Sequence, residues 1–132
     1  MAAGRYSFII EQGATLDFEL AYKDSGSNPI DLTDYQARMQ IRPSIGSDTV
    51  ILTLSSSVAD DGTGLNMSGS DGLNPLTSGT IGVFISANSS SQLDFNTAVY
   101  DLEIASGSEY PIVTRILEGE IQLNKNVTIG SF

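Results

Sequence analysis

Carboxylates stand two residues apart at Asp17 and Glu19, and again at Asp101 and Glu103. Glycoside hydrolysis requires two carboxyl groups facing each other across roughly 5 to 10 Å, one of them with a raised pKa. Here, however, each pair alternates with apolar residues, so both of its members point to the outer face of a strand. Outward charges of this kind also keep sheet edges from aggregating. The sequence therefore predicts solvated sheet faces at these positions rather than a catalytic pair.

A second group of carboxylates borders glycines in the middle of the chain. Asp60 and Asp61 precede a glycine, and so does Asp71. Calcium binding is one reading, but neither stretch matches the ligand spacing of an EF-hand loop. Asp side chains that accept hydrogen bonds from nearby backbone N–H groups in turns explain both stretches equally well. We expect turns here and no metal site.

The chain contains no histidine and no cysteine. It therefore cannot build a Ser-His-Asp triad, a thiolate nucleophile or a zinc site of the usual kind. We predict no catalytic, cofactor-binding or metal-ligating residue, and we expect that the protein is not an enzyme. Without disulfides, the fold must be held together by its core and its contacts.

The charge of the 132-residue chain is strongly acidic, with a net value of −10 from 16 acidic and 6 basic residues. The basic residues are scattered, at Arg5, Lys23, Arg38, Arg42, Arg115 and Lys125. Nucleic-acid binding needs a cationic stripe that releases counterions from phosphates, so we predict no nucleic-acid partner. The apolar stretch before Glu11 is too short for a signal peptide, and no run approaches membrane-spanning length. We expect a soluble protein that is made in the cytoplasm and has no membrane partner.

Alternation of apolar and polar residues recurs along the whole chain and is clearest over residues 14–23 and 35–43. Further strands are predicted over residues 5–12, 49–54, 80–86, 98–104, 111–117 and 118–124. This spacing predicts an all-β fold, an antiparallel immunoglobulin-like β-sandwich of about seven to nine strands. Residues 100–123 read as a hairpin within it. The predicted core residues are Phe18, Leu20, Met39, Ile41, Val83, Ile85, Leu102 and Ile104.

Two short helical turns are predicted between strands. One lies within residues 30–37, where Asp31 or Thr33 occupies an N-cap position, and the other starts near Ser86, with Leu93 packing onto the core. The glycine-rich residues 58–78 predict a long loop or a weak edge hairpin. No repeat or linker divides the chain, so residues 1–132 are expected to form a single sandwich domain with short extended termini.

The order of these motifs resembles that of a known protein family. The chain opens with RYSFIIEQGATLDFELAYKDSGSNPIDLTDYQARMQIRP and continues through GTIGVFIS, YDLEI, VTRILEGEIQL and NVT. This order resembles a family of small tailed-bacteriophage β-sandwich proteins encoded among tail and baseplate genes, and it is similar to the N-terminal domain of some upper baseplate proteins. The resemblance covers nearly the whole chain. Residues 60–78 and the final TIGSF depart from it.

The resemblance implies a virion structural protein, made in the host cytoplasm, that docks onto other virion proteins in the tail, baseplate or neck in several symmetric copies. It implies no catalytic residue. The terminal residues 1–5 and 127–132, Phe132 included, are the expected contacts with neighbours. The alternatives are a capsid decoration protein and a carbohydrate- or ligand-binding module, which would use exposed aromatic rings. Carboxylate catalysis is a third reading.

Overall fold

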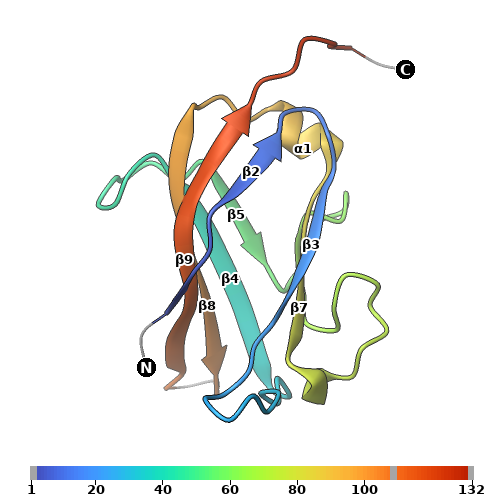
Figure 1. The fold of residues 1–132 in the computed structure, drawn as a ribbon, viewed down its shortest axis with the longest axis vertical. Coiled ribbons are helices and arrows are strands. Elements are labelled where there is room, and N and C mark those ends of the chain that lie inside the picture. The colour runs from blue at the N-terminus through green and yellow to red at the C-terminus, as the bar shows by residue number, and fades with distance from the viewer. Residues whose placement is uncertain (1–2, 108–109, 131–132) are drawn as a thin grey trace.

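Two facing sheets make up the computed structural model, which describes residues 3–107 and 110–130 (Figure 1). The strands are β1 (Gly4–Arg5), β2 (Phe8–Glu11), β3 (Leu16–Ala21), β4 (Tyr35–Arg42), β5 (Leu52–Ser55), β6 (Gly64–Asn66), β7 (Thr80–Ile85), β8 (Thr97–Ser106) and β9 (Ile112–Asn124). A short 3-10 helix, η1 (Leu76–Ser78), precedes β7, and one α-helical turn, α1 (Ala87–Ser91), follows it.

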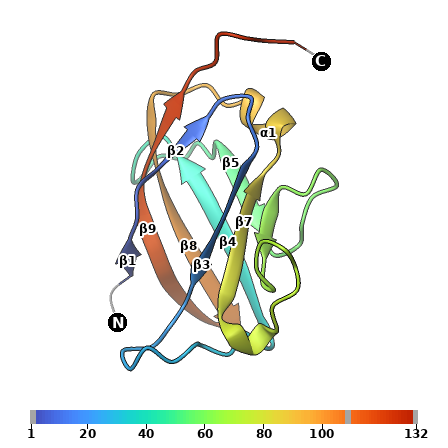
Figure 2. The same cartoon turned by 45° about the vertical axis from the view of Figure 1, so that its right-hand side comes forward.

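The strand order identifies the sandwich. The larger sheet runs β1-β9-β8-β4-β5, with β2 also paired to β9, and the smaller sheet runs β3-β7-β6 (Figure 2). In immunoglobulin lettering, β3, β7 and β6 correspond to strands B, E and D, whereas β5, β4, β8 and β9 correspond to C′, C, F and G. The predicted all-β sandwich is confirmed.

The N-terminal strands correct the expectation of a purely antiparallel fold. The single strand predicted over residues 5–12 is two short strands, and both run parallel to β9, with Gly4 opposite Leu117 and Phe8 opposite Ile121. Between them the register with β9 is unchanged: the Tyr6 backbone N–H donates to the carbonyl of Glu118 at 2.9 Å, and the Tyr6 carbonyl lies against Gly119. Alternation determines which face a side chain occupies, but it carries no information about the direction of the neighbouring strand. The larger sheet is therefore mixed.

Strands β8 and β9 form the predicted hairpin, although residues 111–117 and 118–124 belong to one continuous strand. The register shifts beside Leu102, so that Leu102 lies opposite Leu117 and the next residue, Glu103, lies opposite Arg115. This β-bulge leaves Ile116 as the additional residue of β9. Both Ile116 and Leu117 can therefore pack against the core although they are adjacent in sequence.

The core between the sheets contains most of the predicted residues. Those that are buried as predicted are Met39, Ile41, Val83, Ile85, Leu102 and Ile104. Phe18 and Leu20 pack against this core but are only half-buried, because β3 is an edge strand of the smaller sheet. Further fully covered side chains, which the prediction did not name, include Ile10, Leu32, Leu54, Leu65, Ile81 and Ile121.

One of the two predicted helical turns is present. Ser86 caps α1 as expected, and Leu93 is buried. Residues 30–37 form no helix, which corrects the second prediction. The carboxylate of Asp31 accepts hydrogen bonds from the Thr33 backbone N–H at 2.9 Å and the Thr33 hydroxyl at 2.6 Å, a local turn instead of a helix cap. Asp34 then adopts a left-handed conformation, with φ of 65°, directly before β4.

The glycine-rich residues 58–78 supply an edge strand, in line with the second of the two alternatives for this segment. Strand β6 pairs antiparallel with β7, with Leu65 opposite Val83. Residues after β6 then pass close over β7 at Gly82, where an added Cβ would lie 2.7 Å from the backbone nitrogen of Ser70. The close passage explains why β7 carries a glycine in an otherwise apolar strand.

Candidate functional site

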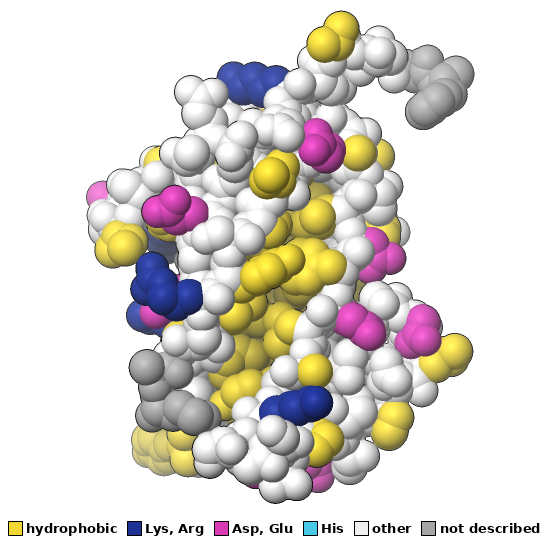
Figure 3. Space-filling model, in the orientation of Figure 1, with side chains coloured by type: hydrophobic (Ala, Val, Ile, Leu, Met, Phe, Trp, Pro, Cys, Tyr) yellow, Lys and Arg dark blue, Asp and Glu magenta, His cyan; other side chains and the backbone are white. Residues whose placement is uncertain are grey.

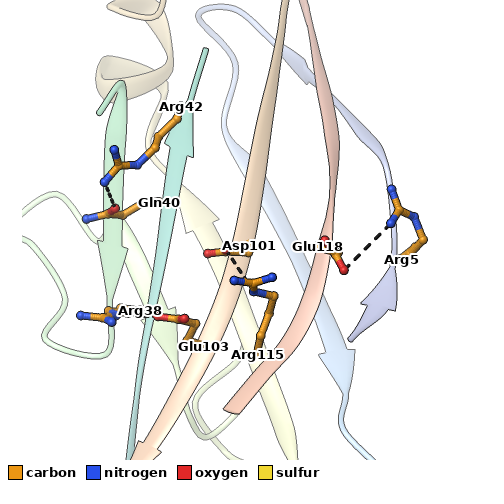
Figure 4. A network of polar contacts seen from close by, with 8 residues as sticks. All are labelled: Arg5, Arg38, Gln40, Arg42, Asp101, Glu103, Arg115 and Glu118. Atoms are coloured by element: carbon orange, nitrogen blue, oxygen red, sulfur yellow. Dashed lines mark hydrogen bonds and ion pairs between the residues drawn. The ribbon is translucent and has the colours of Figure 1, made fainter. Parts of the chain in front are cut away.

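The charged side chains of the β8–β9 hairpin lie together on the outer face of the larger sheet (Figure 4). Asp101 and Glu103 come from β8, and β9 contributes three further charged residues. Strands β4 and β1 add arginines on either side. Together they line a shallow hollow of about 700 Å³, which we call the charged face; its charged residues are Arg5, Arg38, Arg42, Asp48, Asp101, Glu103, Arg115, Glu118 and Glu120.

Three ion pairs cross between neighbouring strands on the charged face. They join Arg38 Nε to Glu103 Oε1 at 2.8 Å, Arg115 Nε to Asp101 Oδ2 at 3.2 Å, and Arg5 Nη1 to Glu118 Oε1 at 3.9 Å. Strand register explains the first and third pairs, because in each the two residues lie directly opposite each other. The second pair is diagonal, since Arg115 lies opposite Glu103 and reaches Asp101.

Arg42 holds one rim of the charged face in place. Its guanidinium donates to the side-chain oxygen of Gln40 at 2.9 Å and to the backbone carbonyl of Ser47 at 2.5 Å. Ser47 belongs to the connection between β4 and β5, where Ile45 is 91% exposed. A fixed loop with an apolar side chain therefore borders the charges.

The outward orientation predicted for Asp101 and Glu103 is confirmed, but their full solvation is not. The Glu103 side chain is 21% exposed and that of Asp101 is 40% exposed, because the arginines cover them. Burial raises the pKa of the Asp101 carboxyl above its usual value, Arg115 lowers that pKa, and Glu103 raises it again. A carboxyl with a raised pKa is a feature of acid–base sites, but an arginine partner favours its ionised form.

The other predicted carboxylate pair lies on the other sheet. Asp17 and Glu19 are exposed on β3, so the structure does not bring them together with Asp101 and Glu103. The Glu19 carboxylate accepts hydrogen bonds from the backbone N–H of Ser70 at 3.0 Å and from its hydroxyl at 3.1 Å. Glu19 thereby attaches the loop after β6 to the sheet.

Asp61 stabilises the start of α1 rather than binding a ligand. Its carboxylate accepts hydrogen bonds from the hydroxyl of Ser86 at 2.6 Å, the hydroxyl of Ser89 at 2.7 Å and the backbone N–H of Thr63 at 3.0 Å. These donors hold the pKa of Asp61 well below its usual range, and the Ser86 hydroxyl has the largest effect. The carboxylate thus connects the loop before β6 to the helical turn after β7.

The other carboxylates of the calcium hypothesis are exposed turn residues. Asp71 accepts a hydrogen bond from the Leu73 backbone N–H at 3.0 Å, which is the predicted local turn. Asp60 is exposed. Within residues 3–107 and 110–130, no group of three acidic side chains is close enough to hold a metal ion.

An aromatic cluster at the open side of the sandwich was not anticipated from the sequence. The rings of Phe8 and Phe18 lie 5.1 Å apart, Phe8 and Tyr100 lie 5.2 Å apart, and Tyr6 packs on Phe18 at 5.8 Å. The available signal was that Phe8, Phe18 and Tyr100 occupy core-facing strand positions; Tyr6 lies between β1 and β2. The cluster bridges β2 and β3, which share no backbone pairing among the described residues.

Comparison with known proteins adds no assignment. No protein-family model matches the chain, and no curated protein sequence matches it significantly. In the part of the chain that the structure describes, no helix has the length and apolar character needed to cross a membrane.

Proposed function

We propose that this protein is a structural component of a tailed-bacteriophage virion and docks onto other virion proteins through its charged face, in the tail, baseplate or neck. The observation that carries the proposal is the arrangement of this face, on which cross-strand ion pairs lie in a hollow beside the exposed Ile45. Paired charges bordered by apolar side chains supply the specificity and the apolar contact that protein interfaces combine. The order of strand motifs supports the virion as the setting.

The ion pairs favour docking over catalysis. Asp101 and Glu103 each have an arginine within 3.2 Å. A general base must be free to take a proton, whereas these carboxylates are already engaged as acceptors. On an interface, the same arginines can exchange one acidic partner for another on a neighbouring protein. We therefore propose that the protein is not an enzyme.

Modest contacts of this kind suffice in a symmetric particle. Each copy of a repeated protein makes the same contacts, so many weak interfaces act together and raise the overall avidity. A single anchoring residue is then unnecessary. This matches a face on which the charges are distributed over β1, β4, β8 and β9.

Incorporation into particles tests the proposal. Phage particles produced in the source host would be purified and analysed by mass spectrometry, with the chain supplied as wild type, Arg115→Glu or Lys125→Glu. Both substitutions change the charge equally, and the two side chains are 52% and 51% exposed, but only Arg115 lies on the charged face. We expect Arg115→Glu to lower occupancy and Lys125→Glu to leave it unchanged.

Two results would contradict the proposal. Particles that lack the chain altogether would contradict the virion role. Equal occupancy of Arg115→Glu and Lys125→Glu, with both variants folded by circular dichroism, would remove the charged face as the docking surface. A low-resolution reconstruction of particles with and without the protein would distinguish a tail, baseplate or neck position from that of a capsid decoration protein.

The alternative is a carbohydrate- or ligand-binding module, and one observation favours it. Tyr110 is 86% exposed and Tyr6 is 48% exposed, so both rings could stack on a sugar. They lie on separate elements, Tyr6 between β1 and β2 and Tyr110 beside the start of β9. A glycan array, followed by Tyr110→Ala and Tyr6→Ala variants, would detect this function through binding that either substitution removes.

A further inference from the structure

Strand β3 leaves one edge of the smaller sheet unpaired within the described residues. The Tyr22 backbone N–H donates to the carbonyl of Gly79, in register with the β3–β7 pairs, so the even-numbered residues of β3 exchange hydrogen bonds with β7. The backbone N–H and C=O groups of Asp17, Glu19 and Ala21 consequently point away from β7. An edge of this kind can accept another strand.

Apolar side chains lie beside this free edge. Figure 3 shows a continuous hydrophobic strip along the front of the molecule, in the region where β9 and β3 border the opening between the sheets in Figure 1. The strip exists because β1 and β2 pair with β9, so the opening towards β3 is closed by side chains alone. The rings of Tyr6, Phe8 and Phe18 pack on one another where β2 and β3 share no backbone pairing, and Tyr6 is 48% exposed.

The C-terminal segment has the properties of a strand that could fill this opening. Residues 125–130 leave β9 and extend beyond the end of the sandwich in both ribbon views (Figures 1 and 2). Val127 is 96% exposed and Ile129 is 82% exposed. Being two residues apart, they would share one face of an extended strand. Asn126 is fixed at the base of the segment, where its backbone N–H donates to the Gln12 side chain at 3.1 Å.

Charge also favours this segment as the occupant. The chain carries a net charge of −10, and the outer side of β3 bears Asp17 and Glu19, so an acidic strand would be repelled there. Residues 125–132 contain no acidic side chain and include Lys125. This makes them compatible in charge with the edge that they would join.

We propose that residues 126–130 of one copy add to the free edge of β3 in a second copy, with Val127 and Ile129 seated against Tyr6 and Phe18. Backbone hydrogen bonds to Asp17, Glu19 and Ala21 provide affinity in this mode, and the apolar strip provides specificity. Reciprocal exchange closes a dimer, whereas one-way donation links copies into a ring or a filament. The inference concerns self-association and is independent of the charged face and of a virion setting.

A peptide in trans tests the strand addition directly. A chain lacking residues 128–132, labelled with ¹⁵N, would be titrated to millimolar concentration with a peptide of residues 124–132. We expect chemical-shift changes and slower hydrogen exchange at the amides of Asp17, Glu19 and Ala21. A peptide carrying both Val127→Asp and Ile129→Asp should cause neither. Unchanged β3 amides, or changes confined to another region, would overturn the proposal.

The full-length chain provides the second measurement, by sedimentation equilibrium over a range of concentrations. We expect weak, concentration-dependent association that is lost on deletion of residues 128–132. Asp17→Pro should also abolish it, because proline removes an N–H that points away from β7, whereas Asp17→Ala should retain it. If Asp17→Pro fails to fold, the proposal is tested by the deletion and by the comparison of the wild-type and doubly substituted peptides.

Two outcomes, one from sedimentation and one from hydrogen exchange of the full-length chain, would overturn the proposal. One is association that persists unchanged after the deletion. The other is a full-length monomer whose β3 amides are protected at every concentration, because the segment would then occupy its own edge.

Discussion

The Tyr100 hydroxyl donates a hydrogen bond of 2.5 Å to the backbone carbonyl oxygen of Tyr6, so a core residue of β8 holds the segment that joins β1 and β2. The contact passes over Gly119, which lies opposite Tyr100 in the β8–β9 ladder. Burial raises the pKa of Tyr100 above its usual value, so the hydroxyl stays protonated and can donate at neutral pH. This relationship positions Tyr6 beside the hydrophobic strip.

Replacing Tyr100 with phenylalanine tests the importance of that hydrogen bond. The ring still fills its place in the core, but the Tyr6 carbonyl loses its donor. We expect the free energy of unfolding to fall by about 0.5 to 1.5 kcal/mol, the usual net contribution of one hydrogen bond. Urea denaturation would measure it. Tyr22→Phe, at a half-buried tyrosine, is the control and should change stability by less than about 0.5 kcal/mol; equal effects would contradict the prediction.

Gly119 should tolerate no side chain. An added Cβ would lie 2.0 Å from the carbonyl oxygen of Tyr6 and 2.7 Å from its carbon, both backbone atoms. We expect Gly119→Ala to destabilise the fold by about 1 to 3 kcal/mol, because the N-terminal strands must move. Gly4→Ala is the matched control, since its nearest contacts would be 3.6 Å away. A Gly119→Ala variant as stable as Gly4→Ala would show that β1 and β2 adjust freely.

Alternation predicted β4 and β8 well because each has one buried face along most of its length. In β4, for example, Met39 and Ile41 are buried between polar neighbours. The same reasoning could not give the parallel direction of β1 and β2 or the bulge at Leu102. Both depend on which strand lies alongside, and local sequence does not encode that neighbour. Phe18 is half-buried for a similar reason, since edge position is a property of the whole sheet.

The sequence predicted the outward orientation of the carboxylates at the candidate site, but it did not predict their ion-pair partners. The alternating pattern around Asp101 and Glu103 indicated an outer face, and the structure agrees. Their arginine partners, Arg115 and Arg38, lie 14 and 65 residues away in sequence. Only the strand register brings them into contact. The assignment of Phe132 as an assembly contact stays a prediction, because that residue lies outside the described part.

A double-mutant cycle on Arg38 and Glu103 should give a measurable coupling energy for their ion pair. Their contact of 2.8 Å includes a direct Nε–H donor, and the Glu103 side chain is 21% exposed. We expect a coupling energy of about 0.2 to 1 kcal/mol from the two alanine variants and their combination. The Arg5–Glu118 pair, at 3.9 Å and with Arg5 77% exposed, should give no measurable coupling. Equal coupling in the two pairs would contradict this ranking.

The Asp61 carboxylate should make stability depend on pH in acid. Hydrogen bonds from Ser86, Thr63 and Ser89 lower its folded-state pKa below the ordinary 3.8, so this contribution is complete above 3.8 and is lost as the pH falls through the folded-state value. We expect wild type to be more stable than Asp61→Asn at neutral pH, with the difference narrowing in acid. Denaturation across a pH series measures this. A difference that does not change with pH would contradict a lowered folded-state pKa for Asp61.

Asp101 should produce the opposite pH dependence, because burial raises its folded-state pKa above the ordinary 3.8. As the pH rises through 3.8, the Asp101 carboxyl ionises in the unfolded chain before it ionises in the folded protein, and this stabilises the unfolded chain. Wild type should therefore lose stability relative to Asp101→Asn until the pH exceeds the folded-state pKa of Asp101. The same pH series measures both variants, and Asp17→Asn, at an exposed position, serves as the control. If wild type instead gains stability over Asp101→Asn in this range, the attraction of Arg115 outweighs burial, and the charged face holds Asp101 as a firmly ionised partner.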